Sequence, residues 1–169
     1  MMRLLPWRSS QPTDVTCGQP AIILKSCGTY SLVINKKKIT LSTRGHSDMI
    51  DITGRIEEFV DESGVEDGIV SIFVQGSTGA VTTIEYEPNL VKDFINAMEK
   101  IAPSDISYEH GKTWNDDNGH SHVRASIIGS SETIAIRDGH LVLGTWQQVV
   151  VIDFDTSPRD RVVFFTLYG

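Results

Sequence analysis

The chain of 169 residues is 40% hydrophobic and 22% charged, which is typical of one globular domain and excludes a disordered or fibrous protein. Its formal net charge of -7 argues against a nucleic-acid partner, because sequence-independent binding to phosphate backbones needs a concentrated basic surface. No segment reaches the roughly 18 uninterrupted apolar residues of a membrane span, and no signal-peptide core is recognisable, so we expect a cytoplasmic protein with no membrane partner.

The N-terminal region predicts an extended arm over residues 1–20, which contains three prolines and no hydrophobic periodicity. One domain is expected to follow over 21–169. Cys17 and Cys27 lack the spacing of a disulfide framework or a zinc site and are expected to be free thiols. The basic run Lys36-Lys37-Lys38 is interpreted as a hairpin turn or a solvated strand edge. Short β-prone runs predict an antiparallel meander: 21–26, 30–34 and 39–42.

Residues 48–64 predict a helix with Thr53 as its N-cap, one apolar stripe, and Gly64 as its C-terminal stop. The nearly continuous apolar run 69–75 predicts a strand that is buried on both faces. A Gly-Ser-Thr-Gly turn then leads into a further predicted strand at 81–85.

Pro88 opens a second predicted helix, which carries an apolar stripe from Leu90 to Ile101 and is closed by Pro103. A polar loop follows at 108–119. Beyond this loop, turn-forming residues separate four predicted strands: 122–128, 132–136, 148–154 and 161–167. Two main helices within a mainly antiparallel set of strands predict an α+β fold, either a β-sandwich or a strongly curved sheet.

Histidines gather around the polar loop, where His110, His120 and His122 fall within thirteen residues. If His120 and His122 stand on a strand, their side chains project from one face, which suits metal chelation or paired acid–base chemistry. Folding of the loop would bring His110 over them. The alternative is a solvated loop without chemistry. His140 follows a tight Asp-Gly turn and is expected to be exposed and inert.

Two turns of small residues are candidate anion-binding sites. Gly76-Ser77-Thr78-Gly79 follows a predicted strand, so its amides and hydroxyls would lie at a strand end, where an anionic group can approach the backbone. It is not a Walker motif, because no Gly-Lys-Ser/Thr follows it. Gly129-Ser130-Ser131 has the same character. A plain turn is the alternative at both places.

The ends of other predicted strands carry further candidate residues. Trp146 and Gln147 could wall a pocket for a flat heterocycle, and Trp146 could equally fill the core. Glu85 closes a predicted strand and is left open. Two aspartates are interpreted as structural because arginines lie near enough to pair with them: Asp153 and Asp155, with Arg159 and Arg161.

Several of these segments together resemble the YjbQ-like family, whose members are described as secondary thiamine-phosphate synthases. The resemblance runs from Ile39 to the C-terminus, and its distinctive parts are Gly144-Thr145-Trp146-Gln147 and the segment from His122 to Gly129. The remaining similarity lies in these residues, in order: Asp51-Ile52-Thr53, Ser63-Gly64, Gly76-Ser77-Thr78, Glu85, Tyr108 to His110, Asn118 to His122, and Ala125 with Gly129-Ser130.

The resemblance implies an α+β subunit that assembles into a homo-oligomeric ring, with a trimer favoured and sites near subunit boundaries. It also implies a transferase reaction, in which a pyrimidine methyl diphosphate is joined to a thiazole phosphate and pyrophosphate leaves. His110 and His122 fall on the family's histidine positions and Glu85 falls on its glutamate, so these are the implied catalytic residues. Many members carry a histidine where this chain has Gly76, which weakens a three-histidine metal site. His120 stands where many relatives carry an acidic residue.

Two hypotheses follow. In the first, the protein is a thiamine-phosphate synthase that binds a small phosphorylated heterocycle. A divalent ion, either magnesium with the substrate or a zinc-like ion, would be held by His110, His120 and His122. In the second, the protein is a non-catalytic oligomer that binds a metal or phosphate ligand after losing part of the site at Gly76. The first hypothesis assigns substrate contacts to these residues: Gly76, Ser77, Thr78, Arg124, Ser130, Ser131, Trp146 and Gln147.

Overall fold

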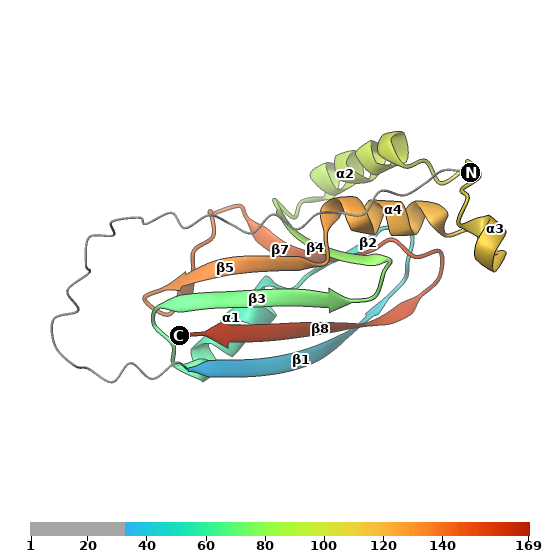
Figure 1. Ribbon diagram of the computed structural model, residues 1–169. Helices are drawn as coiled ribbons and strands as arrows, with labels where there is room; N and C mark the ends of the chain where they lie inside the picture. Colours follow the sequence, from blue (N-terminus) through green and yellow to red (C-terminus); the bar gives the residue numbers. More distant parts are fainter. Residues whose placement is uncertain (1–32) are drawn as a thin grey trace, which may run out of the picture. The chain divides into compact units, whose positions relative to one another are not determined.

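The computed structural model describes residues 33–169, which form eight strands and four helices (Figure 1). The strands are β1 (Ile34–Thr43), β2 (Asp48–Asp51), β3 (Gly68–Gln75), β4 (Gly79–Ile84), β5 (Ser131–Arg137), β6 (His140–Leu141), β7 (Gln148–Asp153) and β8 (Arg159–Tyr168). The helices are α1 (Thr53–Ser63), α2 (Pro88–Ile101), α3 (Gly111–Trp114) and α4 (Gly119–Ile128). The predicted arm, both cysteines, the predicted strand at 21–26 and most of that at 30–34 lie outside the described residues.

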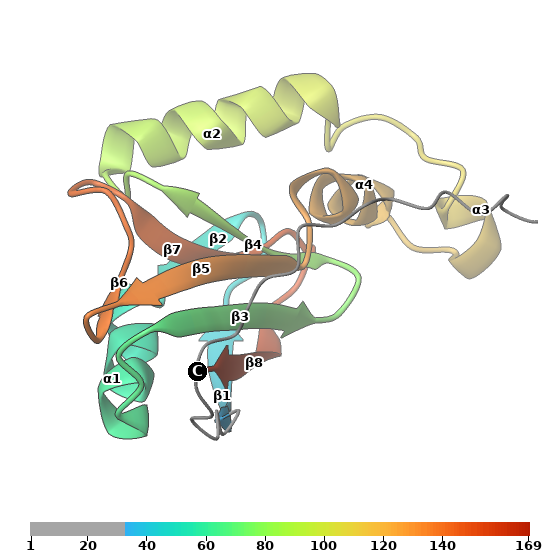
Figure 2. The same cartoon turned by 60° about the vertical axis from the view of Figure 1, so that its left-hand side comes forward.

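The strands form two antiparallel sheets, one of five strands in the order β1-β8-β3-β5-β6 and one of three in the order β2-β7-β4. The main core lies between the sheets and α1, and it includes Phe59 of α1, Val151 of β7 and Phe165 of β8. A second core joins the other face of the smaller sheet to α2 and α4 through Ala80, Met98 and neighbouring residues. Figure 2 shows α2 and α4 beside this smaller sheet. The predicted α+β fold is confirmed.

The segment predicted as one helix over 48–64 divides into a strand and a helix. Residues Asp48–Asp51 pair with β7, so α1 begins only at Thr53. The Asp51 carboxylate accepts hydrogen bonds from the Thr53 amide and hydroxyl at 2.8 and 2.6 Å, so Thr53 is not the cap that was predicted. The end was predicted correctly, because Gly64 adopts φ +67°, the left-handed conformation that favours glycine.

Strand β3 is buried on one face, not on both as its apolar run predicted. Val70, Ile72 and Val74 point into the main core and are fully buried, whereas Ile69 and Phe73 are 42% and 45% exposed. Side chains alternate across a strand, so the two exposed residues share the outer face of the five-stranded sheet. The apolar run is continuous because both faces of β3 carry apolar side chains. The other described residues leave the outer face partly exposed.

Helix α2 follows its prediction closely. The Glu87 carboxylate accepts hydrogen bonds from the Asn89 and Leu90 amides and caps the first turn, where Pro88 needs no donor. The helix ends at Ile101, two residues before Pro103. Within residues 33–169, no helix is both long and apolar enough to cross a bilayer.

The prediction of a strand at 122–128 is wrong, because residues Gly119–Ile128 form helix α4. Its buried residues include Arg124 and Ala125, adjacent positions that an alternating strand would place on opposite faces. Ala125 packs in the second core with Ala80, and both small side chains allow α4 to approach β4 closely. This helix changes the geometry expected for the histidines.

Candidate functional site

His110 and His122 form a close pair, which the loop before α4 brings together. Their ring centroids lie 4.4 Å apart with the rings tilted by 49°. His110 precedes the short helix α3, and its Nε2 lies 3.6 Å from an Asp116 carboxylate oxygen. The expectation that His110 folds back over the other histidines is therefore met for His122.

The pKa of His122 is lowered, first by burial and then by the neighbouring His110 ring. Asp116, Asp155 and the backbone of Ser77 act in the opposite direction without reversing the shift. The imidazole of His122 is consequently neutral at pH 7 and can accept a proton or a hydrogen bond.

His120 does not join this pair. Residues two apart on a helix point in directions about 200° apart, so the shared face predicted for His120 and His122 is absent. His120 is 7% exposed and lies beside Tyr108, with ring centroids 6.2 Å apart. Burial, and next the charge of Arg124, lowers the pKa of His120. Its surroundings are those of a core histidine.

The residues present do not fit the divalent ion that was considered. Among residues 33–169, no group of three histidine, cysteine, aspartate or glutamate side chains is arranged to hold a metal. His110 and His122 supply two nitrogens, whereas structural zinc sites use four protein ligands and catalytic sites three. The three-histidine site is not formed, and we derive no chemistry through a metal.

A cavity of about 260 Å³ lies between the β3–β4 turn and α4, and His122 is part of its wall. The two turns predicted to bind anions meet here, since Gly76 and Ser77 line one side and Gly129 and Ser130 another. Backbone hydrogen bonds hold these turns together: the Val74 amide donates to the Ser130 carbonyl at 2.8 Å, and the Val81 amide donates to the Gly129 carbonyl at 3.0 Å.

Two of the hydroxyl residues predicted at these turns lie elsewhere. Thr78 is buried and donates a hydrogen bond to Asp155 at 2.9 Å, so its hydroxyl is committed inside the protein. Ser131 begins β5 and does not line the cavity. Ser126 also lines the cavity, but its hydroxyl donates to the His122 carbonyl at 2.8 Å. The hydroxyls that remain available as donors to a ligand belong to Ser77 and Ser130.

Arg124 is a structural residue and not the predicted phosphate ligand. Its side chain is 3% exposed, and its Nε and Nη2 donate to the Ala102 carbonyl at 2.9 and 2.8 Å. A further ion pair of 2.7 Å joins it to Glu99. Arg124 thereby ties α4 to the C-terminal end of α2, where a positive charge is favourable.

The predicted ring-binding residues lie at the opposite end of the smaller sheet. Strand β4 pairs Gly79 with Asp153 near the cavity and Ile84 with Gln148 at its far end. The five steps along the strand from Gly79 to Ile84 span roughly 17 Å, at about 3.4 Å per residue. Beyond this far end, Trp146 is 70% exposed, Gln147 donates to the Thr83 hydroxyl at 2.9 Å, and Glu85 follows the strand. One chain does not bring these three residues to His122.

Arg161 lies beside the cavity, and the sequence did not identify it as a binding residue. Its predicted pairing is confirmed, because Nη2 donates to Asp153 and also to the Thr78 hydroxyl at 2.6 Å. However, the guanidinium also lies behind Gly76, where a Cβ atom would be 2.8 Å from Nη1. The sequence signal for Arg161 was the alternation of arginine and aspartate at adjoining strand ends. This pattern indicated an ion pair and not a binding residue.

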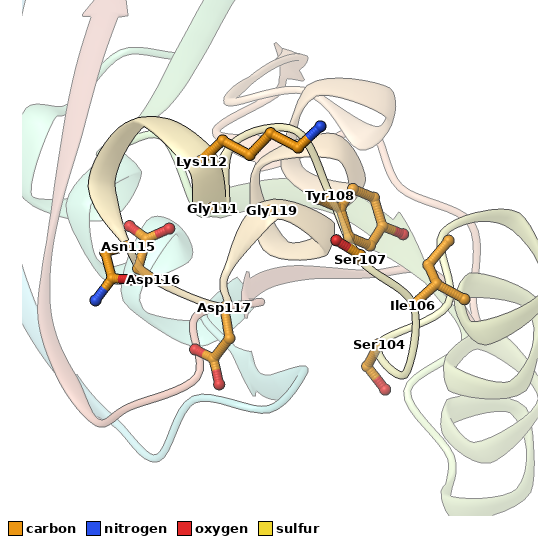
Figure 3. Close-up of a pocket in the computed structure, with 10 residues that line it drawn as sticks. All are labelled: Ser104, Ile106, Ser107, Tyr108, Gly111, Lys112, Asn115, Asp116, Asp117 and Gly119. Carbon is orange, nitrogen blue, oxygen red and sulfur yellow. The ribbon is translucent and has the colours of Figure 1, made fainter.

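A larger cavity, of about 740 Å³, lies on the loops around α3 (Figure 3). Asn115, Asp116 and Asp117 gather on one side of it, with Tyr108 on the other, and Lys112 lies near its rim. Neither histidine of the pair lines it. We therefore place the candidate site at the smaller cavity, where His122 and the two small-residue turns converge.

Known proteins of similar sequence cover nearly the whole described region. The family model described as "UPF0047 protein YjbQ-like" matches residues 37–169. A UPF0047 protein of Methanothermobacter thermautotrophicus is 32% identical over 143 residues, which are 85% of this chain and 97% of that protein. The UPF0047 protein YugU of Bacillus subtilis is 30% identical over 134 residues, which are 79% and 98%.

Solved structures agree with the sequence relatives. A YbjQ-like protein of unknown function from Sulfolobus solfataricus superposes with a TM-score of 0.77 at 30% identity, covering 82% of this chain and 99% of that one. An uncharacterised YjbQ/UPF0047 protein from Clostridium acetobutylicum gives a TM-score of 0.71 at 37% identity, covering 78% and 98%.

These relatives overturn the activity that the resemblance was expected to imply. They are named only as UPF0047 or YjbQ-like proteins, one of them explicitly of unknown function, and none is named as a thiamine-phosphate synthase. The expected transfer reaction with release of pyrophosphate is wrong as an inference from membership. What the similarity does establish is that the chain belongs to the YjbQ-like UPF0047 family.

Proposed function

We propose that this protein binds a small phosphorylated molecule in the cavity between the β3–β4 turn and α4. The observation that carries the proposal is the convergence of Gly76-Ser77, Gly129-Ser130 and His122 on one cavity. These residues come from distant parts of the chain and have in common small size or hydrogen-bonding capacity. Such a combination suits an anion, which needs donors and close access to the backbone.

Hydrogen-bonding groups that face the cavity account for the preference for phosphate. The hydroxyls of Ser77 and Ser130 rotate and can each donate to a phosphate oxygen. His122 is neutral in the free protein and can take up a proton when an anion approaches, because a nearby negative charge raises the pKa of an imidazole. Binding and protonation would then reinforce each other.

Isothermal titration calorimetry with phenyl phosphate and inorganic phosphate tests the proposal, with phenol as a probe that lacks the anion. We expect both phosphates to bind and phenol not to bind. His122→Ala should weaken phosphate binding at least tenfold, whereas His140→Ala, at the exposed start of β6, should leave it unchanged. No heat of binding with the wild-type protein, or equal affinity in the His122 variant, would refute the assignment.

The outer face of the larger sheet supports a second proposal, that the protein is a homo-oligomer. Phe73 lies opposite Phe164 and Ile69 lies opposite Tyr168, and all four side chains are at least 38% exposed. Adjacent large apolar side chains on one face are typical of a protein–protein interface. The resemblance favours a trimer, and light scattering coupled to gel filtration measures the stoichiometry directly.

A further inference from the structure

Arg161 has more hydrogen-bond donors than the described residues satisfy. An arginine side chain carries five N–H donors. Within residues 33–169, only Nη2 has acceptors, namely Asp153 and the Thr78 hydroxyl. Nε is buried with no partner, and Nη1 makes no hydrogen bond there. The side chain is 7% exposed, so these groups lack the free access to bulk water that a surface arginine has.

Two glycines separate this guanidinium from the cavity. A Cβ atom at Gly76 would lie 2.8 Å from Nη1, and a Cβ atom at Gly79 would lie 3.6 Å from Nε. Both glycines line the cavity with Ser77 and His122. Gly76 also adopts φ +125°, a conformation that other residues rarely tolerate. A side chain at position 76 would thus lie against Nη1 at the wall of the cavity.

The charges around Arg161 explain why the part of its guanidinium that carries Nη1 favours an anion. Asp153 is bound through Nη2, and Asp155 pairs with Arg159 at 3.0 Å, so the two carboxylates are matched by two guanidinium groups. An incoming anion therefore meets no unpaired carboxylate within this cluster. It would accept hydrogen bonds from Nη1 of a charged guanidinium whose side chain is 7% exposed, and bonds to a charged donor are the stronger kind.

We propose that Arg161 is the charged ligand of the bound anion, and that the absence of a side chain at Gly76 is what lets the anion reach Nη1. This inference rests on the proposed phosphate-binding function and names the residue that selects for negative charge. It predicts preference for a phosphate over a neutral molecule of equal size, through a contact at the base of the cavity.

The first test uses the wild-type protein, so it does not depend on the stability of a variant. Nitrogen-15 NMR follows the side-chain resonances of Arg161 while inorganic phosphate is added at pH 7. We expect the Arg161 signals to shift along the same saturation curve as the backbone amides of Ser77 and Ser130. Shifts of those amides without any shift at Arg161 would overturn the inference and leave the proposed function standing. No shift at any of them would refute both.

The second test closes the opening at residue 76. Gly76→Ala should raise the phosphate Kd at least tenfold, and Arg161→Lys, which keeps the charge but lacks Nη1, should do the same. Gly64→Ala is the matched control, because Gly64 also has positive φ but a methyl group added there would have no neighbouring atom within 4 Å. Thermal unfolding identifies the variants that fold. Wild-type affinity in folded Gly76→Ala would overturn the proposal even if Arg161→Lys does not fold.

Discussion

Replacement of Arg124 by methionine separates a structural arginine from a ligand-binding one. Methionine keeps much of the volume and removes the guanidinium, which is 3% exposed and holds the Ala102 carbonyl and Glu99. Loss of a charged donor from a buried carbonyl costs about 1.5–3 kcal/mol. The pair with Glu99 adds at most about 1 kcal/mol, because the Glu99 side chain is 42% exposed and water screens it.

Together these contributions predict that Arg124→Met lowers the free energy of unfolding by about 3 kcal/mol. For a chain of this size, that corresponds to a decrease in Tm of roughly 6–12 °C. Urea unfolding followed by circular dichroism measures the first quantity and calorimetry the second. Arg55→Met, at an exposed position of α1, should change the stability by less than about 0.5 kcal/mol.

Phosphate affinity provides the decisive comparison for this variant. Because Arg124 points to the end of α2 and not into the cavity, the folded variant should bind phosphate as the wild type does. The reasoning would be refuted by a stability loss below about 1 kcal/mol, or by a large loss of phosphate affinity with unchanged stability.

Three further predictions follow from the described contacts. Phosphate affinity should rise as the pH falls from about 7.5 to 5.5, because the lowered pKa of His122 leaves this residue neutral at the higher pH and anion binding favours its protonated form. The same calorimetric titration of His122→Gln should show no such contribution of residue 122 to the pH dependence. An identical pH profile in both proteins would contradict the prediction. Phe73→Asp should reduce the mass measured by light scattering, while Lys92→Asp, at an exposed site on α2, should not; an unchanged mass for Phe73→Asp would exclude the face of β3 as the interface. Gly68→Ala should destabilise the protein by about 1–3 kcal/mol, because a Cβ there would lie 2.1 Å from the Tyr168 carbonyl oxygen. Gly54→Ala, on α1 with open space around it, should be neutral or stabilising by up to about 1 kcal/mol in the same urea experiment, and equal effects of the two substitutions would count against the packing argument.

Local signals predicted those elements whose ends are fixed by nearby residues. Helix α2 carries Glu87 and Pro88 at its start and Pro103 just after its end, so its limits follow from short-range chemistry. Helix α4 has no side-chain cap, and its buried surface consists of small or polar residues such as Ala125 and Arg124. Its helical form depends on packing against β4 and α2, which no local pattern reports.

The residues of the candidate site also include some that the sequence could identify and some that it could not. Gly76-Ser77, Gly129-Ser130 and His122 were identified as residue types suited to binding, and the pairing of β3 with β5 explains why the two turns meet. Arg161 was assigned to an ion pair because the sequence places it beside Asp153 and Asp155. Only the structure shows that Nη1 of this guanidinium also lies beside Gly76. The sequence could not show that Trp146 lies away from this cavity, because sequence order does not indicate which end of β4 the residue adjoins.

Strand β1 bears on how copies of this protein can associate. Among the described strands it lies at the edge of the larger sheet and contains Lys36, Lys37 and Lys38. Lys37 bonds to Glu62 of α1 at 2.9 Å, which leaves Lys36 and Lys38 exposed. Two such edges brought side by side would place like charges in register and oppose continuation of the sheet from one copy to the next. The lysines thus disfavour open-ended fibrous growth while leaving face-to-face assembly into a closed particle available.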